Sequence, residues 1–219
     1  VLNTASNNTA VGKDALVANT TASNNTAVGY QAGYSNTTGT RGTFVGMGAG
    51  YTNSTASYNT GVGWYALNAN TTGNLNAAVG DGALQANTTG SENSSVGQGS
   101  LTSNTSGSYN TALGRQALNS NTTASGNTAV GYQAGYSQTT ASGGSSSFFG
   151  HQAGYSLTGL FCTFVGSQAG YSATSGQSNT FVGHAAGYYV TTGSKNTVLG
   201  RYSGNQGGLD IRTSSNNIV

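Results

Sequence analysis

Few side chains in this chain of 219 residues are suited to acid–base, nucleophilic or metal chemistry. Catalysis by carboxylates usually needs two of them close together, one acting as acid and the other as base or nucleophile. A zinc site needs three or four ligands around one ion. Whether such groups can act together depends on the elements that hold them. The residues concerned are Asp14, Asp81, Glu92, Asp210, His151, His184 and Cys162.

These residues are held by a repeat, because the sequence Asn-Thr-Ala-Val-Gly and its variants recur along the chain with a constant period of 17. Only two intervals differ: that from Gly131 to Gly150 is longer by two positions, and that from Gly150 to Gly166 is shorter by one. A short fixed period predicts a stack of coils, each covering the apolar edge of its neighbour. We number each coil from its glycine as position zero. The glycines form a structural ladder of Gly12, Gly29, Gly46, Gly63, Gly80, Gly97, Gly114, Gly131, Gly150, Gly166, Gly183 and Gly200.

Stacking separates the chemical residues from one another. The four carboxylates fall at separate places along the stack, so none of them can form a catalytic pair. His151 and His184 share position +1 but lie two coils apart, roughly 9.6 Å at ~4.8 Å per coil, which is too far to bind one metal ion. Cys162 occupies a position that is usually Asn and is expected to be a small stacked residue. We therefore expect no catalytic residue, no metal, no cofactor and no enzyme activity.

Composition narrows the classes of partner. The chain has 36 Gly, no Pro and 5% charged residues, yet its 13 Tyr and net charge of +2 do not fit a disordered chain. Its six Lys and Arg residues are scattered and form no basic stripe, so nucleic acid is not an expected partner. No apolar run approaches the ~20 residues that span a bilayer, so no membrane insertion is expected.

The repeat predicts an all-β fold. Positions −3 and −1 share one face of an extended strand, mostly Thr and Val, and position −2 points to the other face. Position −2 is small or apolar as well, and strands that are apolar on both faces are normally covered on both. We expect one face to fill a narrow interior with the Ala at position +3, and the −2 face to pack against another chain. The sequence thus predicts a parallel β-solenoid with 17-residue coils that forms an oligomer.

Two kinds of coil alternate in blocks. One kind has Leu at position +4, as in Leu67 and Leu84, and the other has Gly-Tyr at +4 and +5, as in Gly50-Tyr51. Phe at position −2 occurs only in Gly-Tyr coils, which predicts that Phe and Leu compete for one volume. Successive Tyr residues are expected to stack as ladders ~4.8 Å apart.

The remainder of each coil contains Asn-Thr-Thr sequences that are typical of turns. They match the glycosylation pattern Asn-x-Ser/Thr, but the periodicity already accounts for every match. They also place threonines at equivalent positions of successive coils, which leaves an ice-binding solenoid as a minor alternative. These residues are Thr20, Thr37, Thr71, Thr88, Thr105, Thr122 and Thr139.

The motif and the strand that follows resemble a known family. Asn-Thr-Ala-Val-Gly-Tyr-Gln-Ala-Gly-Tyr-Ser at residues 25–35 and 127–137 is similar to bacteriophage tail-fibre repeats, which in turn resemble the head repeats of trimeric autotransporter adhesins. The resemblance covers about residues 8–204. It implies a left-handed β-roll-like solenoid with three chains packed into a fibre, located on a virion or, alternatively, on a bacterial cell surface.

The organisation expected from the repeat has two parts. Residues 1–204 form a solenoid of about twelve coils, whose first residues look like the end of an earlier coil. Residues 205–219 break the period and look like a non-repeat exit segment toward a C-terminal domain that is missing here. The resemblance then implies a structural role, namely to extend and present a host-attachment surface.

Candidate contact residues lie at positions +1 and +2, which vary most and carry aromatic, amide and charged side chains. Such side chains suit stacking on sugars and hydrogen bonding to them. The coils themselves are therefore an alternative glycan- or receptor-binding module, with a host cell-surface glycan or protein as partner. The only apolar turn, which contains Phe161, is a further candidate. The candidate surface contacts are Tyr30, Trp64, Tyr65, Arg115, Tyr132, Phe161 and Tyr202.

Overall fold

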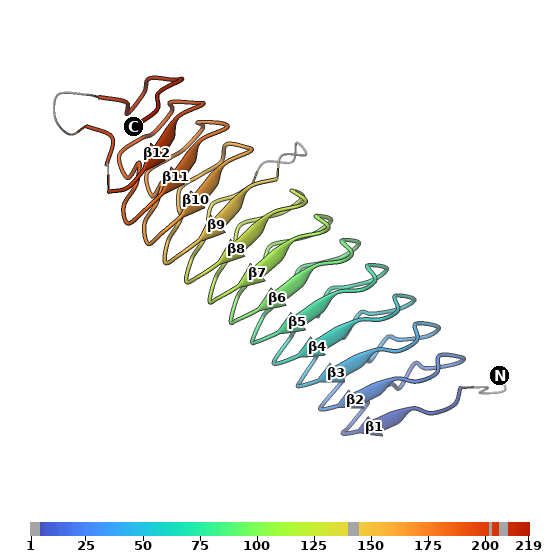
Figure 1. The fold of residues 1–219 in the computed structure, drawn as a ribbon. Helices are drawn as coiled ribbons and strands as arrows, with labels where there is room; N and C mark the ends of the chain where they lie inside the picture. Colours follow the sequence, from blue (N-terminus) through green and yellow to red (C-terminus); the bar gives the residue numbers. More distant parts are fainter. Residues whose placement is uncertain (1–4, 140–144, 202, 206–209) are drawn as a thin grey trace. The chain divides into compact units, whose positions relative to one another are not determined.

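The computed structural model describes residues 5–139, 145–201, 203–205 and 210–219. It divides into two compact units, Val1–Asn110 and Thr111–Val219, and every named element is a strand (Figure 1). No helix in the described residues is long and apolar enough to cross a membrane. The first unit contains β1 (Thr9–Val11), β2 (Thr26–Val28), β3 (Thr43–Val45), β4 (Thr60–Val62), β5 (Ala77–Val79) and β6 (Ser94–Val96). The second contains β7 (Thr111–Leu113), β8 (Thr128–Val130), β9 (Ser147–Phe149), β10 (Thr163–Val165), β11 (Thr180–Val182) and β12 (Thr197–Leu199).

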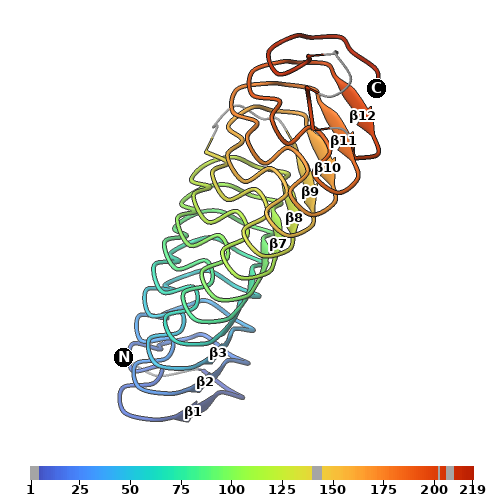
Figure 2. The same cartoon turned by 90° about the vertical axis from the view of Figure 1, so that its left-hand side faces the viewer.

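Within each unit every strand pairs in parallel with the next strand along the chain, and the backbone returns between them through an open loop (Figure 2). Thr26 lies opposite Thr43, one period later in the sequence. Ser147 lies opposite both Thr128 and Thr163, although the interval to the first is longer than one period and the interval to the second is shorter. The strands therefore keep their register through the irregular region. The predicted parallel β-solenoid of about 17-residue coils is confirmed, and the extra residues fall outside the strands.

The glycine at position zero is required by the backbone. Gly29 has φ +135°, a conformation open almost only to glycine. A Cβ on Gly29 would lie 2.6 Å from the carbonyl oxygen of Gly46 in the next coil. Positions +2 and +4 also have positive φ whatever their residue, with φ 56° at Gln31 and φ 54° at Leu67. The coil therefore bends at fixed positions, and the ladder of glycines allows successive bends to approach closely.

The central residue of each strand points into the coil. Ala27, Phe44 and Ala78 are fully buried, whereas Val11 and Val79 on the neighbouring face are 57% and 39% exposed. We expected the −2 face to pack against another chain, and that expectation is wrong. The −2 side chains fill the interior together with positions +3 and +4, which point inward from the opposite wall. The outward face consists of positions −3 and −1.

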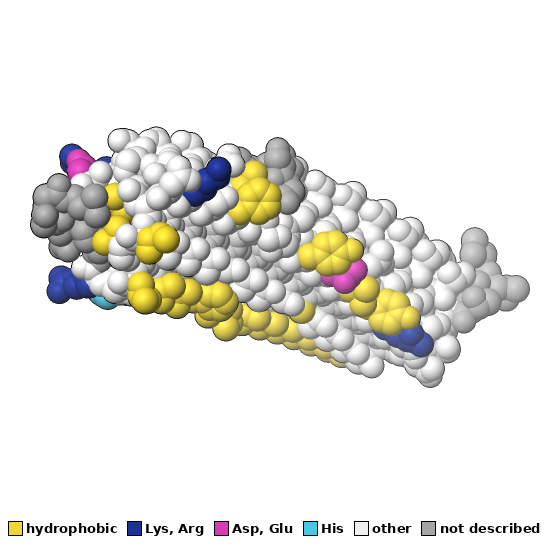
Figure 3. Space-filling view, turned by 45° about the horizontal axis from the view of Figure 1, so that its top comes forward, with side chains coloured by type: hydrophobic (Ala, Val, Ile, Leu, Met, Phe, Trp, Pro, Cys, Tyr) yellow, Lys and Arg dark blue, Asp and Glu magenta, His cyan; other side chains and the backbone are white. Residues whose placement is uncertain are grey.

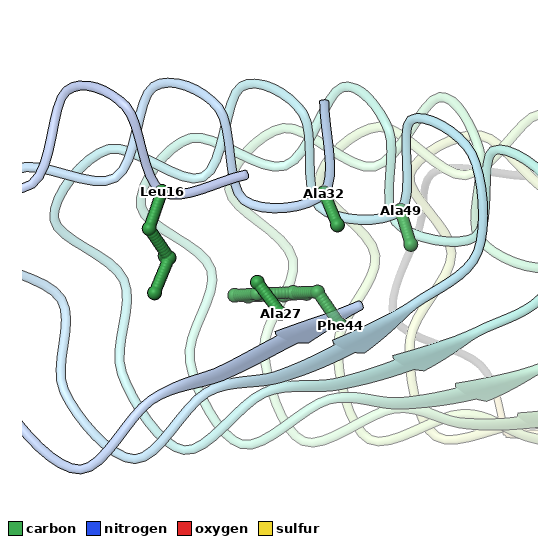
Figure 4. Packing of buried hydrophobic residues seen from close by; sticks show 5 residues of the cluster. All are labelled: Leu16, Ala27, Ala32, Phe44 and Ala49. Atoms are coloured by element: carbon green, nitrogen blue, oxygen red, sulfur yellow. The ribbon is translucent and has the colours of Figure 1, made fainter. Parts of the chain in front are cut away.

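The interior of the first coils shows how the space is shared (Figure 4). Ala27 and Phe44 rise from the strands, and Leu16, Ala32 and Ala49 descend from the opposite wall. The Phe44 ring occupies the volume that a side chain at position +4 would take. A Cβ on Gly33 would lie 3.1 Å from the ring, and a Cβ on Gly50 would overlap it.

The same relation holds in the second unit, where a Cβ on Gly154 would lie 2.5 Å from the Phe148 ring. The predicted competition between Phe at −2 and Leu at +4 is therefore confirmed in both units.

Asparagines at position +7, which the sequence places in turns, form a buried ladder in the first unit. The amide nitrogen of Asn70 donates to the side-chain oxygen of Asn53 (2.9 Å), and that of Asn87 donates to Asn70 (2.8 Å). Each amide also donates to a carbonyl of its own coil, as Asn70 does to Gly73 (2.9 Å). Because these amides are buried and bonded on both sides, they are structural groups and are closed to glycosylation in the folded chain.

In the second unit position +7 is still polar at the buried Asn121 and Gln138 and becomes apolar after them, with Leu157, Ala173 and Val190 fully buried. Ile211 continues this series, because residues 210–219 lie on the last coil. The backbone nitrogen of Asn217 donates to the side-chain oxygen of Asn196 (3.0 Å), and that of Val219 donates to the carbonyl of Thr197 (2.9 Å). The offset from Asn196 to Asn217 is larger than one coil, so the intervening chain contains an insertion. Residues 210–219 thus continue the stack where the sequence suggested an exit from it.

Candidate surface sites

Among the described residues, no three His, Cys, Asp or Glu side chains come close enough to hold a metal ion. Cys162 is buried, and burial raises the pKa of its thiol to about 11, so the thiol is neutral at physiological pH. Asp210 pairs with Arg212 at 2.6 Å on the surface, and the hydrogen bond from Arg212 lowers the pKa of that carboxyl.

Two of the predicted contact residues at position +1 pair with cations. The Lys13 ammonium lies 5.9 Å from the centre of the Tyr30 ring in the first unit. In the second unit the Arg115 guanidinium lies 6.0 Å from the Tyr132 ring, which stacks on His151 at 5.3 Å. These contacts are weak at exposed sites, about 0.5–1 kcal/mol each. The structure therefore gathers Arg115 and Tyr132 into one aromatic–cation cluster and leaves Tyr30 in another.

The remaining predicted contacts are dispersed. Trp64 is 49% exposed, and its ring lies 4.3 Å from that of Tyr65. Phe161 is 56% exposed at position −5 and has φ 59°. Leu157, from the same apolar turn, instead faces the interior. Tyr202 lies outside the described residues.

Tyrosines at position +5 stack as the sequence predicts. Tyr34 and Tyr51 lie 4.9 Å apart in the first unit, close to the spacing of strands. The second unit has a longer stack in which adjacent rings are 5.1 to 5.2 Å apart. Burial, and then the neighbouring tyrosines, raise the pKa of Tyr155 and Tyr188, so these phenols remain neutral hydrogen-bonding groups. The longer stack consists of Tyr136, Tyr155, Tyr171 and Tyr188.

Glutamines at position +2 form a parallel ladder beside the long stack. The amide nitrogen of Gln133 donates to the side-chain oxygen of Gln116 (2.9 Å), and that of Gln152 donates to Gln133 (2.9 Å). An amide has two N–H donors and two acceptor positions, so a ladder that uses one of each fixes the group and leaves capacity for a ligand. The surface therefore presents aromatic rings next to oriented amides.

A groove opens where each tyrosine stack ends. In the first unit a groove of about 270 Å³ is lined by Gln31, Tyr51, Tyr65 and Asn68. In the second unit a groove of about 410 Å³ includes Gln168, Tyr188 and Arg201 in its lining. Tyr65 was among the candidates named from the sequence, and Gln31, Gln168 and Arg201 stand at the candidate positions +1 and +2, but Tyr51, Asn68 and Tyr188 were not expected as contacts. The signal that could have identified them is the point at which a run of Gly-Tyr coils stops.

Charged residues make up only 5% of the sequence. Figure 3 shows scattered charged side chains, and on the C-terminal unit, at the left, a row of hydrophobic side chains.

Comparison of the chain with known protein families, with curated proteins and with solved structures found no match.

Proposed function

We propose that the chain is a structural segment of an extracellular trimeric fibre, a phage tail fibre or an adhesin shaft or head, that extends and presents a host-attachment surface. The observation that supports it most is the outward rank of apolar residues at position −1. This rank supplies one apolar side chain per coil on the face opposite the filled interior. Its members are Val11, Val28, Val45, Val62, Val79 and Val96 in the first unit, and Leu113, Val130, Phe149, Val165, Val182 and Leu199 in the second.

This rank is left open to water in a single chain. Val79, Val96 and Phe149 are 39%, 40% and 41% exposed. An apolar surface that continues from coil to coil is typical of a protein interface. A second and a third copy in parallel would cover it along the same ranks, and three is the number that the resemblance to tail-fibre and adhesin repeats implies.

The test is the mass of the purified chain in solution, measured by multi-angle light scattering. We expect three chains, and we expect the double substitution Val79→Lys with Val96→Lys to give folded monomers, because a buried unpaired ammonium is costly. Leu75→Lys is the matched control. Leu75 is 54% exposed at position −5, where Lys195 occurs naturally, so the trimer should persist. A stable monomer of the unsubstituted chain would refute the proposal.

A glycan-binding module is the second candidate, and the two grooves at the ends of the tyrosine stacks favour it. The role is compatible with a fibre, because the grooves and the −1 rank use different positions of the coil.

The turn threonines, which suggested the ice-binding alternative, are engaged in hydrogen bonds within the coil stack. The turn threonines donate their hydroxyls to the next coil, Thr20 to the carbonyl of Thr37 (3.1 Å) and Thr71 to that of Thr88 (2.9 Å). Threonines also stand outward at position −3 of most strands, and a thermal-hysteresis assay tests them. We expect no activity; an activity that Thr60→Lys abolishes would replace the fibre proposal.

A further inference from the structure

We propose that the groove at the end of the Tyr34–Tyr51 stack binds a neutral pyranose unit of a glycan. This inference deepens the host-attachment role proposed above and rests on it for its biological meaning. The groove itself is built from one chain, so its binding can be measured whatever the oligomeric state.

The groove exists because the stack stops. One face of the Tyr51 ring lies against Tyr34, with the ring centres 4.9 Å apart and the planes 14° from parallel. The next coil has Asn68 at the position where a third ring would stand, so the other face of Tyr51 is left for the groove. An aromatic face of this kind suits the C–H face of a sugar ring, which is apolar and flat.

The opposite side of the groove is also aromatic and is held in place. A Cβ on Gly48 would overlap the Tyr65 ring, so this ring lies in the space that the glycine leaves. Trp64 packs on Tyr65 at 4.3 Å and limits its rotation. Gly48 stands at position +2, where glutamine is common in other coils, and its lack of a side chain is what admits the ring.

Two amides supply the polar contacts. The Asn68 amide nitrogen donates one hydrogen bond to the carbonyl oxygen of Gly48 (3.1 Å), which orients the group. An amide held in this way has a second N–H and an acceptor oxygen for sugar hydroxyls. Gln31 brings a further amide from the other side. None of the four lining residues is charged, so the groove suits a neutral sugar. Its volume of about 270 Å³ is slightly below that of common ligand sites, ~300–1,000 Å³, and fits one sugar unit.

The arrangement recurs independently in the second unit. Its long stack ends at Tyr188, and the next coil places no tyrosine there, since the backbone nitrogen of Tyr189 donates to the carbonyl of Ser203 (2.7 Å), as Thr52 does to Asn68 in the first unit. A groove again opens there, with an amide from Gln168. A stack end, a groove and a glutamine amide therefore occur together in both units.

The test uses the full chain and the methyl glycosides of glucose, galactose, mannose and N-acetylglucosamine as probes. Trp64 is the only tryptophan and lies against Tyr65, so its fluorescence reports on this groove. We expect a saturable change with at least one glycoside. We expect Tyr51→Ala to weaken binding by about tenfold or more, equivalent to about 1.4 kcal/mol. Asn68→Tyr should abolish it by extending the stack into the groove.

Tyr34→Ala is the matched control, because it removes the same ring stack but no residue that lines the groove. It should bind the sugar nearly as well as the unsubstituted chain. Equal losses in Tyr34→Ala and Tyr51→Ala, in variants that retain the native circular dichroism spectrum, would overturn the proposal, as would the absence of a saturable response to all four probes. Either result leaves the mass measurement of the fibre proposal unaffected.

Discussion

At the scale of single residues, backbone conformation decides which side chains the coil accepts. At position zero before the last coil, φ is positive and a carbonyl of the next coil lies where a Cβ would stand, as at Gly29 and Gly63, so two independent constraints select glycine. Position +4 has positive φ without that close carbonyl, and Leu67 or Leu84 is accepted there at φ 54° and 51°. The strain of a left-handed leucine, roughly 1–2 kcal/mol, is offset by its complete burial.

This distinction predicts different outcomes for two neighbouring glycines. Gly63→Ala should destabilise the first unit by at least about 2 kcal/mol, because its Cβ would lie 2.5 Å from the carbonyl oxygen of Gly80 at φ +134°. Gly61→Ala should cost far less and stay within about 1 kcal/mol of neutral, since its Cβ would lie 3.2 Å from the carbonyl oxygen of Ala66 and position −2 is alanine in several coils. Urea unfolding followed by circular dichroism measures both. Similar losses in the two variants would contradict the account.

Cys162 predicts a dependence of stability on pH. The folded chain holds the thiol proton more tightly, since burial raises its pKa from 9.0 to about 11. Its contribution to stability is therefore complete below pH 9 and is lost as the pH rises through 11, by up to about 2–3 kcal/mol.

Cys162→Asn is the matched variant, because the asparagine at this position in another coil donates to a carbonyl of the next turn, as Asn25 does to Gly39 (2.9 Å). In Cys162 the sulfur faces the equivalent carbonyl of Gly176. All other groups are the same in both proteins, so the quantity to compare is the difference in unfolding free energy between them. A difference that stays constant from neutral pH to about pH 11 would show that the thiol titrates normally.

At the scale of the element, a strand and the wall opposite share one volume. The Phe44 ring touches the space of position +4 in its own coil, at Gly50, and in the preceding coil, at Gly33. Phe148 repeats this with Gly154 and Gly135. A phenylalanine at position −2 therefore needs glycine at +4 in two successive coils, which is a stricter condition than exclusion within one coil.

Placing Phe at Ala78 in β5 tests this condition. Leu84 and Leu67 occupy the two +4 positions, so Ala78→Phe should overpack the interior and cost ~1–3 kcal/mol. Leu84→Gly should recover part of the loss, and adding Leu67→Gly should recover more. Urea unfolding of the variants gives the coupling energies. Purely additive effects would show that the ring does not meet these leucines.

At the scale of the whole chain, each coil contacts only its neighbours. A variant that lacks one complete coil should therefore fold, whereas a variant that lacks part of a coil should not. Deletion of Thr71–Asn87 removes one complete period, joins Asn70 to Thr88 and restores the register of every ladder. We expect this variant to keep a cooperative thermal transition and the native circular dichroism spectrum. Deletion of Thr71–Ala78 removes only part of a coil and should destroy both, because strands would then face turns. A folded product of this shorter deletion would contradict the ladder account.

Much of the fold could be predicted because the repeat is so regular. The period gave the coil length, and the restriction of Phe to Gly-Tyr coils gave the shared interior volume that Phe44 and Gly50 display. The tyrosine ladders followed from the runs of Gly-Tyr coils. The groove beside Tyr51 was not predicted, because it depends on what a coil lacks at Asn68 and Gly48, and an empty volume has no residue that marks it in a sequence.

The sequence by itself determined the coil length, the parallel register and the ladder of glycines at position zero, since all three follow from a fixed period. The direction of the strand faces was decided only by the tertiary structure. Val at −1 and Ala or Phe at −2 are both apolar, so alternation cannot tell inside from outside. The backbone conformation decides which of the two faces points inward. Positive φ at positions zero, +2 and +4 turns the chain back so that −2, +3 and +4 meet, which leaves the valines outside.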